Sequence, residues 1–172
     1  MMKILGASIV VFATTYFGFY LAKTYAERPN QIRNLRSALK MLETEVVYGA
    51  TPINEAFRHI GKRIKEPVSS LFIQTAKRLE NGDGLSFIEC WKYSLNEEWR
   101  NTFLKKSEYE ILLQLGHVIG LSGKADQVKH IHLALANLEV EELQAKEDHE
   151  KYAKVSKSLG VLSGILIVIL ML

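Results

Sequence analysis

The feature that most constrains this chain is a run of nineteen residues, 4–22, that contains no charged side chain and has a lysine at each border. At about 1.5 Å per helical residue, such a run spans about 30 Å, the thickness of the hydrocarbon core of a bilayer. A second uncharged run, residues 158–172, is rich in leucine, isoleucine and valine. We therefore predict two transmembrane helices with one domain, residues 23–157, between them and a short tail, residues 1–3, before them.

Basic residues gather on the domain side of both apolar runs, although the net charge of the chain is only +3. Residues 23–40 hold five basic side chains and one acidic side chain, and Lys151, Lys154 and Lys157 precede the second run. By the positive-inside rule, this distribution predicts that the domain is cytoplasmic. A cleaved signal peptide is the alternative for the first run, but the run is longer than the apolar region of most signal peptides. The single cysteine, Cys90, is compatible with a reducing compartment.

Small residues recur at helical spacing in both apolar runs. Thr14, Gly18 and Ala22 are four residues apart, and Gly160 and Gly164 form a G-x-x-x-G pair. Small residues at this spacing allow helix backbones to approach closely in lipid. We predict that Gly18, Gly160 and Gly164 pack the membrane helices on each other or on a membrane partner. The alternative is that these glycines are tolerated in membrane helices without a packing role.

Apolar residues at spacings of three and four predict that the domain is all-α, a compact bundle of about six helices. No segment of the domain shows a convincing alternation of apolar and polar residues, which would indicate a strand. The first helix is predicted to follow Pro29 and to end by Gly49. The second is predicted to open at Thr51 and Pro52, as N-cap and first helical residue, and the third to follow Pro67.

Capping patterns and acid–base pairs predict the remaining three helices. Ser86 with Glu89 and Ser107 with Glu110 have the spacing of a capping box, so each pair is predicted to open a helix. The last helix is predicted to run from about residue 125, because no glycine or proline follows until residue 160. From Glu142 onward its acidic and basic residues lie four apart, which predicts a solvent-exposed stalk that continues into the second membrane helix.

Few residues form patterns that indicate catalysis or ligand binding. The chain contains no G-x-x-x-x-G-K-[ST] phosphate loop. His130 and His132, two residues apart on a helix, point about 200° away from each other and cannot form an i, i+4 metal pair. Cys90 and Trp91 lie on an apolar helix face and are predicted to be buried. We predict no catalytic, cofactor-binding or metal site, no bound nucleic acid and no small-molecule substrate; the basic residues near the first run are expected to meet lipid head groups.

Several segments, in the same order along nearly the whole chain, resemble the stage III sporulation protein AB family. They are AKTYAERPNQIR at 22–33, YGATPINEA at 48–56, LKKSEYEIL at 104–112, KHI at 129–131 and KSLG at 157–160. Proteins of that family are similar to the F-type inner-membrane platform of type II secretion and type IV pilus machines. The turn at 49–56, a glycine followed by a helix start, is similar to the repeated pattern of that platform.

The resemblance implies a non-enzymatic part in a secretion-like channel complex between mother cell and forespore, in the mother-cell membrane that surrounds the forespore. It implies a cytoplasmic partner similar to the secretion-type ATPase called stage III sporulation protein AA. Other membrane members of the complex and membrane lipid are the further partners. The alternative is a static scaffold that recruits these partners without ATP-linked movement.

Charged residues in or near the family-like segments are predicted to bind a partner, because we expect them to be exposed. They are Arg33, Arg36, Lys105 and Glu108. Glu142 joins them, because it belongs to an acidic cluster that a basic partner would recognise. These five residues make up the predicted partner-binding set.

Overall fold

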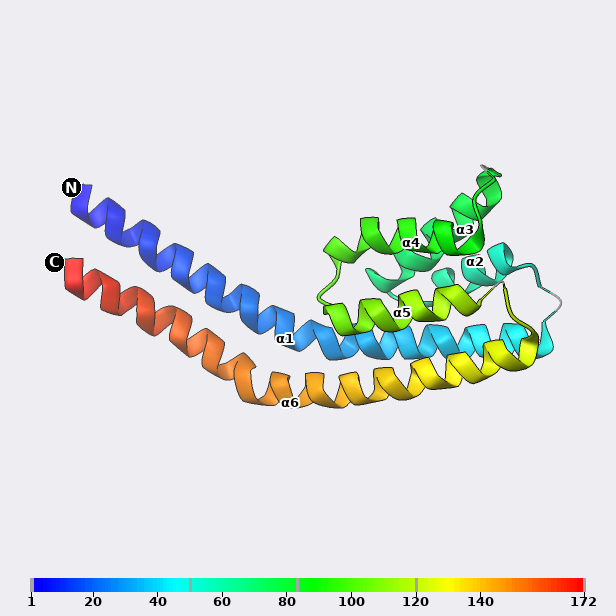
Figure 1. Cartoon of the computed structure of the whole chain (residues 1–172). Helices are drawn as coiled ribbons and strands as arrows, with labels where there is room; N and C mark the ends of the chain where they lie inside the picture. The colour runs from blue at the N-terminus through cyan, green and yellow to red at the C-terminus, as the bar shows by residue number, and fades with distance from the viewer. Residues whose placement is uncertain (1, 50, 83, 120, 172) are drawn as a thin grey trace. The chain divides into compact units, whose positions relative to one another are not determined.

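The computed structural model describes residues 2–49, 51–82, 84–119 and 121–171, and it describes only the backbone at 2–11 and at most positions after 152. In these residues every regular element is a helix, and the predicted all-α class with about six helices is confirmed. The elements, labelled in Figure 1, are α1 (Met2–Tyr48), α2 (Ile53–Arg63), α3 (Val68–Asn81), α4 (Phe87–Glu98), the 3-10 turn η1 (Trp99–Asn101), α5 (Lys106–Val118) and α6 (Lys124–Met171).

The packing of the chain divides it into two units. The terminal unit consists of residues 1–29 and 143–172, and the central unit consists of residues 30–142. The two long helices, α1 and α6, contribute residues to both units, whereas α2 to α5 belong to the central unit alone.

In the terminal unit, α1 and α6 contact each other through aromatic and charged side chains. The rings of Tyr25 and Tyr152 have their centroids 5.6 Å apart. Arg28 is buried, and its Nη1 atom lies 3.8 Å from the carboxylate of Asp148. Within the described part of the chain, no helix has an apolar segment long enough to cross a bilayer. The two transmembrane helices of the sequence stay predictions.

The first helix passes through Pro29, so the prediction that it starts after this residue is wrong. Proline inside a helix removes one backbone hydrogen bond, which is why the sequence alone indicates a boundary there. In the structure α1 continues without interruption, with Ala22 and Arg28 buried before the proline and Ile32 and Leu35 buried after it. Burial on both sides of Pro29 therefore outweighs the local preference for a helix end.

The core of the central unit lies between the two long helices and the four shorter ones. Figure 1 shows α1 and α6 running antiparallel along one side of this unit, with α2 to α5 against them. The α2 helix packs on α3, α3 on α4, and α4 on α5. Of the apolar stripe predicted for α1, Ile32, Leu35, Leu39 and Leu42 are confirmed as buried core residues, whereas its last member, Val46, is half-buried.

A cluster of aromatic side chains fills the centre of this core. The ring of Phe57 lies 5.3 Å from that of Phe72, 5.2 Å from that of Phe87 and 5.6 Å from that of Trp91, measured between centroids. The indole N–H of Trp91 donates a hydrogen bond of 2.8 Å to the carbonyl of Leu112, so its polar atom is satisfied inside the core. Burial of Trp91 confirms the prediction made for it from the sequence.

The capping box predicted at Ser86 and Glu89 is confirmed. Ser86 precedes α4, and both its backbone N–H and its hydroxyl donate hydrogen bonds to Glu89 Oε2, at 2.8 and 2.6 Å. The hydroxyl and the backbone bond lower the pKa of the Glu89 carboxyl. Their contribution to stability is therefore present above the ordinary pKa of glutamate and is lost as the pH falls through the lowered pKa.

The α2 helix begins one residue later than predicted. It starts at Ile53, and Pro52 occupies the N-cap position with an extended backbone, φ −55° and ψ 144°. The carbonyl of Pro52 accepts the first helical hydrogen bond from Ala56, at 3.0 Å. Thr51 is therefore outside the helix, and the prediction that it caps α2 is wrong.

Candidate partner-binding surface

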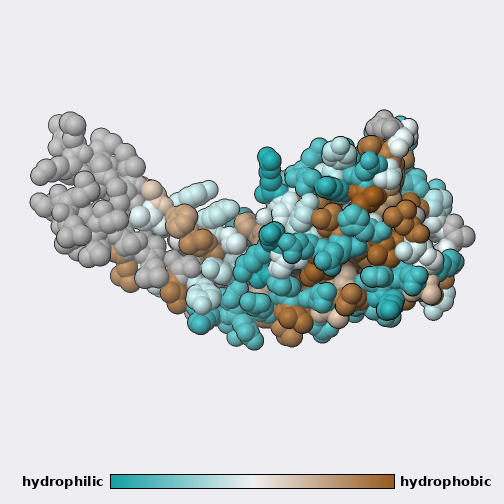
Figure 2. Space-filling view, viewed as in Figure 1, coloured by the Kyte–Doolittle hydropathy of each residue, from teal (hydrophilic) through white to brown (hydrophobic). Residues whose placement is uncertain are grey.

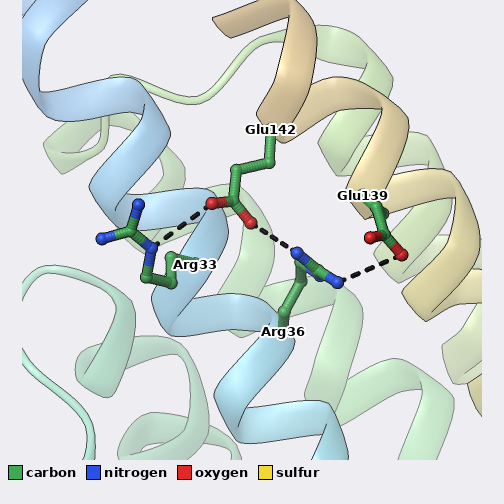
Figure 3. Close-up of polar contacts among 4 residues, drawn as sticks. All are labelled: Arg33, Arg36, Glu139 and Glu142. Atoms are coloured by element: carbon green, nitrogen blue, oxygen red, sulfur yellow. Dashed lines mark hydrogen bonds and ion pairs between the residues drawn. The ribbon is translucent and has the colours of Figure 1, made fainter. Parts of the chain in front are cut away.

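Two helix segments that are far apart in the sequence meet at an ion cluster, which Figure 3 shows. The Arg33 Nε donates a hydrogen bond of 3.3 Å to Oε1 of Glu142, and the Arg36 Nη1 donates one of 2.6 Å to Oε2 of the same carboxylate. The Nη2 of Arg36 also lies 3.2 Å from the carboxylate of Glu139. One buried carboxylate thus binds two guanidinium groups, and one of these binds a second carboxylate.

The spacing of the four residues explains why they come together. Arg33 and Arg36 are three residues apart on α1, and Glu139 and Glu142 are three residues apart on α6, so each pair lies on one face of its helix. The side chain of Glu142 is only 4% exposed, whereas those of Arg36, Arg33 and Glu139 are 23%, 57% and 60% exposed. The cluster therefore runs from a buried centre to an exposed edge, and its formal charges sum to zero.

The structure corrects the expectation that Glu142 is exposed at the start of a solvated stalk. Glu142 is buried, and Ala145, one turn further along α6, is buried too. The sequence paired Glu142 with a basic residue four positions away, whereas the structure pairs it with two arginines more than a hundred positions away. Local spacing could not reveal these partners, because they depend on how α1 packs on α6.

The second predicted pair, Lys105 and Glu108, lies together at the start of α5, but only Lys105 is exposed as expected. The Glu108 side chain is buried, and its Oε2 accepts a hydrogen bond of 2.7 Å from the backbone N–H of Lys105. A carboxylate at this position caps the helix and is favoured by the helix dipole. The capping box predicted at Ser107 and Glu110 is therefore wrong, and α5 begins at Lys106, one residue before Ser107.

The glycines predicted to pack membrane helices are only partly described. Gly18 is buried within α1. Gly160 and Gly164 lie outside the residues whose surroundings the structure describes. The packing role of the three glycines stays a prediction.

The residues that could carry chemistry are kept apart or buried. Cys90 is buried and forms no disulfide bond. His130 and His132 are both exposed, and the Nε2 of His132 lies 2.6 Å from the carboxylate of Glu43. Among the residues that the structure describes, no three histidine, cysteine, aspartate or glutamate side chains are grouped so that they could hold a metal ion.

Gln31 is a polar core residue that the sequence reasoning missed. Its side chain is buried, and its Oε1 accepts a hydrogen bond of 2.8 Å from the backbone N–H of Phe103, in the segment before α5. This bond joins α1 to the segment that carries Lys105 and Glu108. Nothing in the spacing of the sequence distinguishes Gln31 from an exposed helix residue, so no sequence signal could have identified it.

Replacing the buried carboxylate tests the ion cluster. The Glu142→Gln variant keeps the shape of the side chain but removes its charge, so Arg36 loses its shortest charged contact in a half-buried place. We expect a loss of about 1.5 kcal/mol in the free energy of unfolding. The matched variant Glu139→Gln removes an exposed member of the same cluster and is expected to change stability by less than about 0.5 kcal/mol. Thermal unfolding of both variants measures the difference, and equal losses would contradict a buried centre.

The central unit is a helical bundle in which two long antiparallel helices are joined by an ion cluster and packed with four shorter helices (Figure 1). A family model for stage III sporulation protein AB matches residues 3–172. Stage III sporulation protein AB of Bacillus subtilis (strain 168) is 45% identical over 172 residues, which cover 100% of both chains. A solved structure of stage III sporulation protein AB is 44% identical and has a TM-score of 0.68, over 72% of this chain and 96% of that chain. The chain belongs to the stage III sporulation protein AB family.

Proposed function

We propose that this chain is a membrane-anchored, non-enzymatic platform component of a secretion-like complex in sporulation. In this proposal it lies in the mother-cell membrane around the forespore, docks a cytoplasmic secretion-type ATPase and relays the movement of that ATPase to the membrane. Membership of the stage III sporulation protein AB family supports the role in sporulation. The resemblance of that family to the F-type platform of secretion machines supports the ATPase and the neighbouring membrane members.

The observation that carries the relay is the continuity of α6. This helix is a single element from Lys124 to Met171. In the central unit its residues Ile131 and Leu138 are fully buried in the core, and its last fourteen positions, 158–171, belong to the second uncharged run. A force on the central unit would therefore act on the apolar run through backbone hydrogen bonds that no loop interrupts.

The membrane anchoring rests on the sequence of both ends. The runs 4–22 and 158–172 carry no charge, and basic residues follow the first run and precede the second. Runs of this kind favour insertion, and basic residues beside them favour the cytoplasmic leaflet, at about 1 kcal/mol for each base near the surface. This supports a central unit that faces the cytoplasm, where an ATPase would reach it.

Binding to the ATPase tests the proposal directly. The full chain, reconstituted in lipid nanodiscs, is mixed with the AA-type ATPase of the same organism, and the dissociation constant is measured at increasing salt. We expect binding that weakens with salt, because exposed bases such as Arg33 and Lys105 would steer the encounter.

Charge reversal at an exposed base refines the same test. The Lys105→Glu variant is expected to slow association, whereas Lys62→Glu, an exposed base at the end of α2, is the matched control. If the full chain does not bind the ATPase at low salt, the docking role is wrong.

A further inference from the structure

One end of the central unit carries an open groove of about 220 Å³. It lies where α1 ends, α2 begins and α6 begins, and Figure 1 shows these three helix ends close together. Most of the large side chains that line it are apolar, and two charged side chains stand among them. Its lining includes the apolar residues Leu42, Val46, Ile53 and Ile119 and the charged residues Glu45 and Lys124.

Large exposed apolar residues stand beside this groove. Tyr48 is 85% exposed, and it lies in the chain between the groove residues Val46 and Gly49. Leu121 is 81% exposed, and it lies between the groove residues Ile119 and Lys124. Figure 2 shows hydrophobic areas between hydrophilic ones on the visible face of the central unit, so apolar side chains do remain outside the core. An apolar groove with exposed apolar residues at its edge is typical of a protein–protein contact.

The two charged residues in the groove determine in which orientation a charged partner would bind. Glu45 lies in the last turn of α1, where the helix dipole is negative, and Lys124 is the first residue of α6, where the dipole is positive. Within the described residues, neither side chain forms an ion pair. A complementary partner would therefore place a basic group beside Glu45 and an acidic group beside Lys124.

The position of the groove along α1 favours a protein over a lipid. From Asn30, where α1 enters the central unit, to Tyr48 the helix rises about 27 Å. The groove is therefore at the end of this unit opposite to Asn30. The part of α1 before Asn30 leads to the uncharged run 4–22. A lipid head group would instead be expected near Asn30, at the other end of the unit.

We propose that this groove is the contact through which the central unit binds its ATPase partner. A helix of the partner places one apolar side chain in the groove, on the floor formed by the buried Leu42 and Ile119, and its flanking basic and acidic residues meet Glu45 and Lys124. Tyr48 and Leu121 close over the inserted side chain. This inference rests on the proposed function, since that function supplies the identity of the partner.

Two pairs of exposed residues provide a matched test. The double variant Tyr48→Ser, Leu121→Ser removes the edge of the groove, and the double variant Leu133→Ser, Val140→Ser removes two exposed apolar residues of α6 elsewhere. Both are measured in the full chain in nanodiscs, against the AA-type ATPase of the same organism. We expect the groove variant to bind at least about tenfold more weakly and the control to stay within about twofold of the original chain.

The outcomes separate this inference from the proposed function. Weaker binding by the groove variant alone, with the helix content and the thermal midpoint of the original chain, supports the groove. Unchanged binding by the groove variant overturns the groove and leaves the docking role intact. A full chain that does not bind the ATPase at all overturns both. The variant Glu45→Lys is expected to weaken binding as well, and unchanged binding by it overturns the predicted direction of the partner helix.

Discussion

Replacing Gly116 by alanine is expected to lower the free energy of unfolding by about 2 to 3 kcal/mol. A Cβ at this position of α5 would lie 2.3 Å from Cδ1 and 2.9 Å from Nε1 of Trp91, and 3.1 Å from Cδ1 of Ile88. Carbon atoms do not approach so closely, so the indole or the α5 backbone would have to move. Trp91 has little freedom to do so, because it is buried, donates to Leu112 and packs on Phe57.

Thermal unfolding of the full chain measures this loss, and Gly123→Ala is its control. A Cβ at Gly123 meets no heavy atom within 4 Å, and the residue does not have the positive φ that would disfavour alanine. Both variants lose the same freedom of glycine in the unfolded chain, so this contribution cancels in their difference. We expect Gly116→Ala to lower the midpoint by about 5 to 10 °C relative to Gly123→Ala. Equal midpoints would show that the core around Trp91 can rearrange to accommodate the added methyl group.

The parts of the fold that could be predicted from sequence are those in which the pattern within a single helix shows which of its residues are buried or capped. Spacings of three and four identified Ile32, Leu35, Leu39 and Leu42, and all four are buried. The capping box at Ser86 was equally predictable, because its donor and acceptor are three residues apart. In each case the residues that make up the pattern lie within a few turns of the same helix.

The parts that could not be predicted depend on contacts between distant segments. Pro29 reads as a helix boundary, yet burial on either side of it keeps α1 continuous. Glu108 and Glu142 read as exposed charges, yet one caps a helix end and the other joins two helices. Acidic residues on a helix give no local indication of such roles, because the arginines that bind Glu142 come from the far end of the sequence.

The groove could not be predicted from the sequence for a related reason. Tyr48 and Leu121 stand at helix ends and in turns, where no periodic pattern distinguishes an exposed residue from a buried one. Only the packing of α1, α2 and α6 shows that their chain neighbours Val46, Gly49, Ile119 and Lys124 line one groove. Of the predicted partner-binding set, Arg33 and Lys105 are exposed in the structure, and charge patterns alone could not indicate an apolar groove.

Placing glycine at two exposed positions of α6 is expected to impair sporulation if this helix relays movement. Glu147 and Glu150 are exposed in the terminal unit, so their replacement removes no core contact. Each glycine costs about 1 kcal/mol of helix stability relative to alanine, so the double variant would open α6 locally far more often. A helix that opens in its middle transmits force poorly, whereas a static scaffold needs only to stay folded and in place.

The double variant with alanine at Glu147 and Glu150 is the control for the glycine variant. It removes the same two charges as the glycine variant but keeps a strong helix former at both positions. In a strain that depends on this chain, we expect heat-resistant spores at normal numbers from the alanine variant and clearly fewer from the glycine variant, at equal amounts of protein in the membrane fraction. Equal spore numbers would mean that α6 need not be stiff. The relay would then be wrong, and the chain would act as a static scaffold that holds the ATPase without transmitting its movement.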